Sequence, residues 1–277
     1  MLRKIYYYLP PNARFIARKL YYTPIDLWDN ITGKRSDMVP PKGMVYTGSG
    51  DFVRQGERIK KNLIELTDLK PEHHVLDIGS GIGRLAVALT SFLNEKGNYE
   101  GFDVVKAGVE WCQKRITPKH PQFNFKYVDL SNDLYKSSGD SATEFIFPYE
   151  DDQFDRVALI SVFTHMLPDE VAHYLKEITR VLKPGGRCFA TFFVLTEDSE
   201  SEMKNSAFQF KHQHEHFALM DEKVKAANVA FKLDYLEKIS KEAKLEMEQL
   251  YPGYWFKGQN QINARDFQDI VIFKKKI

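Results

Sequence analysis

The sequence is poor in cysteine and in net charge, and it has no long apolar run. Its 277 residues include only Cys112 and Cys188, which favours free thiols in a reducing compartment over a disulfide framework. The chain has 39 basic and 38 acidic residues, so its bulk charge gives no strong attraction to nucleic acid. No apolar stretch is long enough for a signal peptide or a membrane span. We therefore expect a cytoplasmic protein.

The sequence contains enough apolar and aromatic residues for a large folded core. Apolar residues make up 43% of the chain and aromatic residues 13%, which argues against disorder and against a fibrous repeat. The length suits one α/β domain of roughly 200 residues with additional segments. We expect an aromatic and basic N-terminal appendage over residues 1–45, a main domain over 46–277, and an insertion at about 196–228.

A glycine-rich turn between a strand and a helix organises the chain. Residues 75–89 read VLDIGSGIGRLAVAL, in which an apolar strand leads into Gly79, Gly81 and Gly83 and then into a helical pattern. Glycines at such a turn allow a ligand to lie against the backbone N–H groups where the helix begins. The turn therefore predicts a site for a nucleotide-like cofactor.

Strands and helices alternate after this turn. The apolar run at 154–161 is almost continuous, as is typical of a parallel strand covered on both faces. Helical patterns follow Asp51, which suits an N-cap, and occupy 105–116 and the stretch from 168 to 182. The predicted strands are 75–78, 98–103, 123–129, 154–161 and 187–195, with two more near the C-terminus. Such alternation is the pattern of an α/β fold.

Two of the predicted strands end in an acidic residue. Asp103 lies twenty residues after Gly83, and in nucleotide-binding α/β units an acid at that place accepts hydrogen bonds from ribose hydroxyls. Asp129 ends the next strand, at the edge of the sheet where ligands bind. The alternative for Asp129 is a capping role within a loop.

Taken in order, these segments resemble the successive motifs of class I S-adenosylmethionine-dependent methyltransferases. The resemblance covers about residues 70–195 and is carried by VLDIGSGIGR, the acid Asp103, VDLSND, FDRVALISVFTHML and ITRVLKPGGRCFATFF. The family implies a doubly wound, seven-stranded mixed sheet with a Rossmann-like α/β fold. Here that sheet would carry an N-terminal helical appendage and an insertion after the fifth strand. The family also implies S-adenosylmethionine as the cofactor.

The resemblance further implies which residues surround the cofactor. Asp129 would accept from the adenine amino group, and Leu130 would pack on the ring. The strings SVFTHM, GSGDF and QDIVIFKK are similar to bacterial methyltransferases of small-molecule or glycan-type substrates. The expected cofactor contacts are Asp77, Gly79, Ser80, Gly81, Gly83, Asp103, Val104, Asp129, Leu130 and Ser161.

Two basic residues stand where glycine would be expected. Arg84 occupies the third glycine position of a dinucleotide fingerprint, which weakens the nicotinamide alternative. Arg84 either binds an acidic substrate or the cofactor carboxylate, or it pairs with Asp77 or Asp129. Lys244 follows a predicted helix at a position that favours glycine, so we expect that helix to lack a left-handed cap.

His165 is the leading candidate for a general base. It follows the fourth predicted strand at the carboxyl edge of the sheet, and histidine accepts protons near neutral pH. A helix-entry or packing role is the alternative. Tyr46, Tyr254 and Trp255 are candidates for lining an acceptor pocket, with core packing as the alternative for each.

Two further segments fall outside the family motifs. Residues 1–45 interleave tyrosines with basic residues, which suits contact with a membrane surface or with nucleic-acid bases. The alternative, favoured by the neutral overall charge, is that this arm packs on the core or covers the site.

His212, His214 and His216 alternate, and they would converge on a metal only from an extended segment. We expect no metal there, and a solvent-facing or lid segment instead.

Together these features predict methyl transfer from S-adenosylmethionine to a small-molecule or glycan-like acceptor. Oxygen is favoured over nitrogen as the atom that is methylated. The alternatives are a non-catalytic protein that binds a nucleoside cofactor, an NAD-dependent oxidoreductase, and a methyltransferase that acts on a membrane lipid or RNA.

Overall fold

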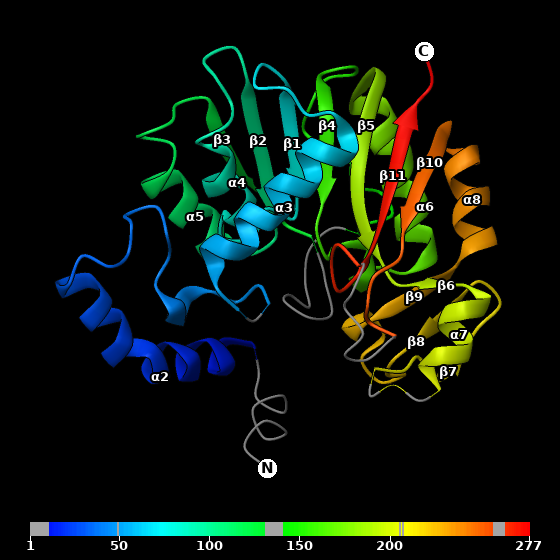
Figure 1. Cartoon of the computed structure of the whole chain (residues 1–277), viewed down its shortest axis with the longest axis horizontal. Coiled ribbons are helices and arrows are strands. Elements are labelled where there is room, and N and C mark those ends of the chain that lie inside the picture. Colours follow the sequence, from blue (N-terminus) through cyan, green and yellow to red (C-terminus); the bar gives the residue numbers. More distant parts are fainter. Residues whose placement is uncertain (1–10, 49, 131–140, 205, 207, 257–263) are drawn as a thin grey trace.

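The core of the protein is a seven-stranded sheet in the order β10-β11-β5-β4-β1-β2-β3 (Figure 1). This computed structural model describes residues 11–48, 50–130, 141–204, 206, 208–256 and 264–277. The strands are β1 (His74–Ile78), β2 (Asn98–Asp103), β3 (Phe123–Tyr127), β4 (Phe154–Leu159), β5 (Leu182–Phe192), β10 (Leu245–Tyr251) and β11 (Asp269–Lys275). The doubly wound mixed sheet confirms the predicted fold class.

The strands β1 to β5 are parallel, and the β10–β11 edge is antiparallel. Asp77 of β1 is paired with Gly101 of β2 and with Ala158 of β4. In contrast, β11 runs antiparallel to both β5 and β10. The carboxyl ends of the parallel strands therefore meet at one edge, which faces the lower side of Figure 1. In α/β sheets this is the edge at which ligands bind.

Helices cover both faces of the sheet and give the molecule its three layers (Figure 1). One face packs against α3 (Phe52–Thr67), α4 (Arg84–Leu89) and α5 (Lys106–Arg115). The other face packs against α6 (Pro168–Val181) and α8 (Leu233–Glu242). Because successive residues of a strand point to opposite faces, the apolar parallel strands contribute side chains to both cores.

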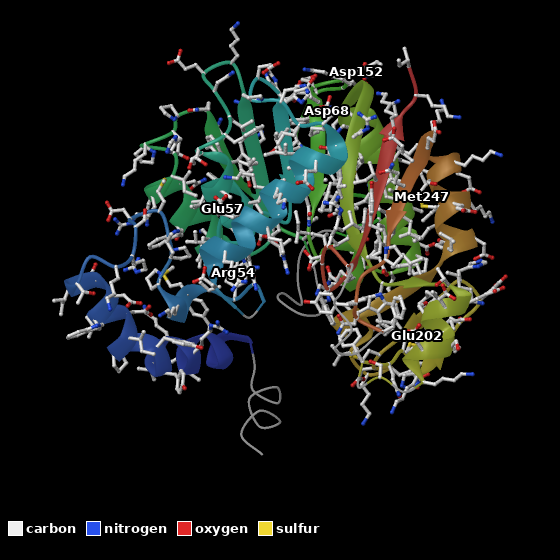
Figure 2. All side chains as sticks on the ribbon, viewed as in Figure 1. Arg54, Glu57, Asp68, Asp152, Glu202 and Met247 are labelled. Carbon is white, nitrogen blue, oxygen red and sulfur yellow. The ribbon has the colours of Figure 1, made fainter. Side chains whose placement is uncertain are left out.

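Helix α3 illustrates how local sequence sets these elements. The side chain of Asp51 accepts from the backbone N–H of Arg54 at 2.7 Å, so the predicted cap is formed. Ile59 and Leu63 are buried against the sheet. Figure 2 shows Arg54 and Glu57 on the outer side of the helix. The helix is therefore amphipathic, and its packing against the sheet follows from its apolar stripe.

A second, smaller sheet follows β5, and the sequence analysis did not predict it. The predicted fifth strand, 187–195, divides: β5 ends at Phe192, and after Phe193 the chain enters the small sheet. Strands of so few residues are too short for the alternation of side chains to be visible in the sequence. In spatial order its strands are β6 (Val194–Leu195), β9 (Val229–Lys232), β8 (Phe217–Leu219) and β7 (His212–Gln213), with α7 (Glu197–Met203) beside them.

A buried carboxylate joins the small sheet to the large one. Asp269, the first residue of β11, accepts from the backbone N–H groups of Val194 at 2.7 Å and Gly253 at 2.6 Å. It also accepts from Nε1 of Trp255 at 2.8 Å, and the Trp255 ring packs on Phe193. Burial raises the pKa of Asp269 to about 6, while these hydrogen bonds oppose the rise. These three hydrogen bonds hold the chain in place where it passes from the large sheet to the small one.

The N-terminal helix α2 (Pro11–Ile31) lies apart from the layered body (Figure 1). On one side, Asp26 accepts from the backbone N–H groups of Lys42 at 2.7 Å and Gly43 at 3.0 Å. Asp29 pairs with the ammonium group of Lys42 at 3.1 Å. The opposite side of α2 exposes large apolar side chains. Within the described ranges, no helix has both the length and the apolar character needed to cross a bilayer.

The alternating histidines of the insertion each contact a different neighbour. His214 stacks on the first residue of β8 with ring centroids 4.4 Å apart, and His216 stacks on Tyr235 at 4.6 Å. His212 places Nδ1 3.5 Å from a carboxylate oxygen of Glu222. In the part of the chain that the structure describes, no group of three or more histidine, cysteine or acidic side chains is arranged to hold a metal ion.

The end of α8 corrects one prediction. Lys244 has a φ of +60°, so the expectation that this terminus lacks a left-handed residue is wrong. Its N–H donates to the carbonyl of Lys241 at 3.0 Å, and Leu245 begins β10 immediately afterwards. The short connection imposes the turn although no glycine is present. For a residue with a β-carbon, this conformation costs roughly 1–2 kcal/mol.

We expect Lys244→Gly to stabilise the fold by roughly 0.5–1 kcal/mol, because glycine adopts positive φ without this cost. Lys241→Gly, one turn earlier in α8, is the matched control and should destabilise by about 1 kcal/mol. Urea unfolding followed by circular dichroism measures both variants. A loss of stability in Lys244→Gly equal to that of the control would show that position 244 carries no strain.

Candidate functional site

The glycine turn after β1 is fixed by hydrogen bonds to β2. The N–H groups of Gly79 and Ser80 both donate to the carbonyl of Phe102, at 2.9 and 3.0 Å. Gly79 and Gly81 have φ values of +74° and +59°. A β-carbon added at Gly79 would lie 2.5 Å from Cγ2 of Val162. Glycine is therefore required at this position both for the backbone conformation and for space.

Asp103, at the end of β2, connects the glycine turn to the next helix. One carboxylate oxygen accepts from the N–H of Gly81 at 2.8 Å, and the other accepts from the N–H of Val105 at 2.7 Å. Burial raises the pKa of Asp103 to about 6, and the backbone hydrogen bonds oppose the rise. At neutral pH the group is therefore mostly ionised, and its oxygens retain lone pairs for a ligand hydroxyl.

Asp77 has a different environment from Asp103. It is buried in the middle of β1, where the hydroxyl of Tyr99 donates to Oδ2 at 2.5 Å. Burial raises the pKa of Asp77 to about 7; the Tyr99 hydrogen bond lowers it and the charge of Asp103 raises it further. Asp77 therefore links β1 to β2 inside the sheet layer.

A cavity of about 300 Å³ opens at the carboxyl edge of β1, β2 and β4. This volume is at the lower end of the range for small-molecule pockets, about 300–1,000 Å³. Much of its wall is apolar, and includes Ile78, Phe102 and Met166. The predicted site residues that border it are Tyr46, Gly79, Asp103, Val104, Leu130, Ser161 and His165.

The other predicted residues lie behind or beside the cavity. Asp129 is exposed, and only Leu130 separates it from residues 131–140, which lie outside the described ranges. Tyr254 packs edge-on against Phe267 at 5.4 Å, and Trp255 is buried in the aromatic core of the insertion. Trp255 therefore packs in a core, which was the alternative to its lining an acceptor pocket. The predicted residues that do not border the cavity are Asp77, Ser80, Gly81, Gly83, Asp129, Tyr254 and Trp255.

Arg84 brings a positive charge to the cavity wall. Its guanidinium donates to the carbonyl of Thr47 and lies 5.7 Å from the centroid of the Phe52 ring. Burial lowers the pKa of Arg84 to about 10, so the group remains charged at neutral pH. Among the described residues no carboxylate pairs with it, so the expected pairing with Asp77 or Asp129 is not formed. The charge is left available to an anionic ligand.

His165 borders the cavity from η2 (Phe163–His165), which follows β4. Its Nδ1 lies 2.9 Å from the carbonyl oxygen of Ala226. Because a carbonyl only accepts, Nδ1 carries the proton and Nε2 keeps its lone pair. Burial lowers the pKa of His165, and the carbonyl contacts oppose this shift. The arrangement holds a neutral imidazole that is able to accept a proton.

The structure adds residues that the sequence analysis missed. Ser161 adopts a φ of +59°, which is uncommon for a residue other than glycine, and its hydroxyl donates to Oε1 of Gln268 at 2.8 Å. More than a hundred residues separate the two, so no local signal pointed to Gln268. Glu170 and Tyr174 lie one turn apart on α6. The additional polar or aromatic residues that border the cavity include Thr47, Phe102, Glu170, Tyr174 and Gln268.

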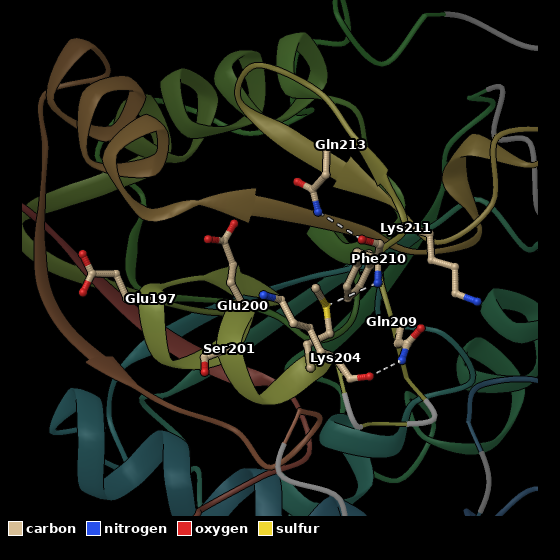
Figure 3. A pocket seen from close by; sticks show the side chains of 9 residues that line it. Glu197, Glu200, Ser201, Lys204, Gln209, Phe210, Lys211 and Gln213 are labelled. Carbon is tan, nitrogen blue, oxygen red and sulfur yellow. Dashed lines mark hydrogen bonds between the residues drawn. The ribbon is translucent and has the colours of Figure 1, made fainter.

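A larger hollow of about 580 Å³ lies elsewhere, on the insertion (Figure 3). It is open to solvent and is bordered by Glu197, Glu200 and Lys204 of the α7 region and by Gln213 of β7. None of the predicted site residues borders it. The smaller cavity, where the glycine turn, a buried carboxylate and a neutral histidine meet, is the better candidate for chemistry.

The part of the chain that builds this cavity matches a known family. Residues 76–190, which run from β1 into β5, match the family model described as a methyltransferase domain. They contain the glycine turn, Asp103 and His165. Residues 76–190 are thus similar to methyltransferase domains, and the sheet that they help to build has the class I methyltransferase fold.

Two curated relatives are similar to this methyltransferase domain. Methyltransferase GfsG of Streptomyces halstedii is 31% identical over 132 residues, which are 48% of this chain and 42% of that protein. The demethylmenaquinone methyltransferase of Bacillus cereus (strain AH187) is 30% identical over 128 residues, which are 46% of this chain and 48% of that protein. The chain thus spans less than half the length of each of these relatives.

A solved structure extends the likeness of fold beyond the methyltransferase segment. The PH0226 protein from Pyrococcus horikoshii OT3 superposes with a TM-score of 0.56 and 18% identity. The superposition covers 84% of this chain and 95% of that chain. At this identity the likeness concerns the fold alone.

The pKa of Asp77 predicts how the stability of the methyltransferase domain depends on pH. The folded value of about 7 lies above the ordinary value of 3.8, so the stabilising contribution of this carboxyl is complete below about pH 4 and is lost as the pH rises through 7. Asp77→Asn lacks this carboxyl, so its free energy of unfolding does not fall in the same way. The free energy of unfolding of the variant minus that of the wild type should therefore increase by roughly 2 kcal/mol from pH 5 to pH 8.

Urea unfolding at several pH values between 5 and 8 measures this difference. Asp198→Asn, at an exposed position of α7, is the control and should follow the wild type at every pH. Parallel curves for Asp77→Asn and the wild type would contradict the raised pKa.

Proposed function

We propose that the protein transfers a methyl group from S-adenosylmethionine to an oxygen atom of a small-molecule or glycan-like acceptor. The observation that carries this proposal is the cavity at the carboxyl edge of the sheet. It combines the glycine turn, the ionised Asp103 and a neutral His165 within a segment that is similar to methyltransferase domains. The acceptor is proposed to be small because the Bacillus relative is named for action on demethylmenaquinone, which is not a macromolecule.

The residues at the cavity fit S-adenosylmethionine. Asp103 offers carboxylate oxygens to the ribose hydroxyls, and the backbone at Gly79 leaves room for a ligand. Leu130 presents an apolar surface to the adenine ring. The guanidinium of Arg84, which has no carboxylate partner among the described residues, suits the carboxylate of the cofactor's amino-acid portion. Asp129 remains a proposed partner of the adenine amino group.

The cofactor supplies a methyl group that is already activated by its sulfonium. The protein must therefore chiefly align the acceptor with the methyl carbon and exclude water, and positioning alone provides much of the rate. In this proposal His165 takes the acceptor hydroxyl proton at Nε2, while Nδ1–H donates to the carbonyl of Ala226. Glu170, Tyr174 and Gln268 give the cavity polar groups that would orient an acceptor.

Calorimetry with S-adenosylmethionine and S-adenosylhomocysteine tests the cofactor assignment. We expect both to bind the wild type. Asp103→Asn should bind each at least tenfold more weakly, about 1.4 kcal/mol, because an amide NH₂ would then face the N–H of Gly81 or Val105. Asp198→Asn is the matched control and should bind normally. No binding of either compound at millimolar concentration, or binding of a nicotinamide dinucleotide instead, would refute the proposal.

His165→Gln and His165→Ala test the role of the imidazole. Both should lower kcat about 10²-fold or more and leave the affinity for S-adenosylmethionine nearly unchanged. Because burial lowers the pKa of His165, the wild-type rate should fall only on the acid side of the ordinary histidine range, and this limb should disappear in both variants. Transfer of labelled methyl groups to fractionated bacterial metabolites and glycans measures the rate. Wild-type turnover in both variants would remove His165 from the mechanism.

A further inference from the structure

The outer face of α2 is an unusually large exposed apolar surface for a single helix. At 100° per residue, its exposed apolar side chains fall within about half of the helical circumference. A helix packed on a folded core buries such a stripe, and a helix in water does not keep one without a partner. The side chains that form this apolar arc are Ile16, Leu20, Tyr21, Ile25, Leu27, Trp28 and Ile31, all at least 41% exposed.

The N-terminal end of the chain is rich in basic residues. The only acidic residues in the first 35 positions are Asp26 and Asp29, and both are engaged by residues 42–43 on the inner side of the helix. The whole chain carries a formal charge of only +1, so the positive charge is concentrated at this end. The basic residues of this stretch whose side chains the structure describes are Arg18, Lys19, Lys34 and Arg35, and Nε of Arg18 donates to the carbonyl of Lys42 at 3.3 Å.

The composition of the apolar arc suits the interface of a membrane. Aliphatic side chains such as Leu20 and Leu27 are suited to the acyl region, while Trp28 and Tyr21 have an apolar ring with a polar group, as is common at the headgroup level. A second copy of the chain is a poorer match, because a symmetric pair would bring two sets of cations together without acids to neutralise them. An anionic surface complements the same cations.

We propose that α2 docks on an anionic membrane surface, with the apolar arc turned toward the acyl chains and the basic residues at the headgroups. The helix would lie in the plane of the interface, as amphipathic helices with basic flanks do. Residues 32–45 connect α2 to Tyr46, which borders the cavity, and α2 lies on the side of the sheet to which the parallel strands point (Figure 1). Docking therefore places the cavity side of the molecule toward the lipid.

Sedimentation of the full chain with sucrose-loaded vesicles tests this proposal. One set of vesicles is phosphatidylcholine alone, and the other contains phosphatidylcholine and phosphatidylglycerol in a ratio of about 3:1. The wild type should bind the anionic vesicles at low salt, bind the neutral vesicles at least about tenfold more weakly, and be released from the anionic ones as salt increases.

The double variant Leu20→Glu with Leu27→Glu places two charges in the middle of the apolar arc. Its partition into anionic vesicles should fall about tenfold or more. Ile146→Glu is the matched control, because Ile146 and Leu20 are both 69% exposed but Ile146 lies outside α2. The control should bind as the wild type does. Circular dichroism and thermal unfolding check that both variants remain folded, which their surface positions favour.

Three results would overturn the proposal. The first is that the wild type binds neither kind of vesicle. The second is equal binding to neutral and anionic vesicles with no effect of salt, which would remove the role of the basic residues. The third is equal loss of binding in Ile146→Glu and in the double variant. A wild-type dimer in vesicle-free solution that the double variant dissociates, together with absence of vesicle binding, would assign the apolar arc to a second copy instead.

Discussion

The carboxylate of Asp103 is the interaction on which the candidate site depends. With one oxygen on the N–H of Gly81 and the other on that of Val105, it fixes the turn after β1 relative to the start of α5. The two donors come from segments that follow different strands, and they meet only because β1 and β2 are parallel and in register. The cavity wall is therefore a direct consequence of the sheet topology together with one buried carboxylate.

Burial then determines the protonation states around this cavity. Arg84 keeps its charge although its pKa is lowered to about 10, whereas His165 is held neutral with its proton on Nδ1. Asp77 does not border the cavity but lies within the sheet, and its pKa of about 7 reflects burial beside Tyr99. The same physical effect, desolvation of the charged form, thus shifts the pKa of residues that border the cavity and of one that lies within the sheet.

The sequence predicted the features that depend on neighbours in the chain. The glycine turn, the Asp51 cap and the apolar strand that precedes His165 were all found because each is a local pattern with a known period or turn chemistry. The small sheet of the insertion was missed because strands of two to four residues show no period. Lys244 was misjudged because a short connection to β10 forces a left-handed residue even where no glycine is present.

The sequence by itself determined the α/β class, the order of strands and helices, and the position of a cofactor-type turn, since these follow from local periodicity and composition. Only the tertiary structure decided which of the predicted residues border the cavity. It buried Trp255 in the aromatic core, left Arg84 without a carboxylate partner among the described residues, and brought Gln268 to Ser161. Such contacts join residues far apart in the chain, and their free energy depends on burial that no local pattern encodes.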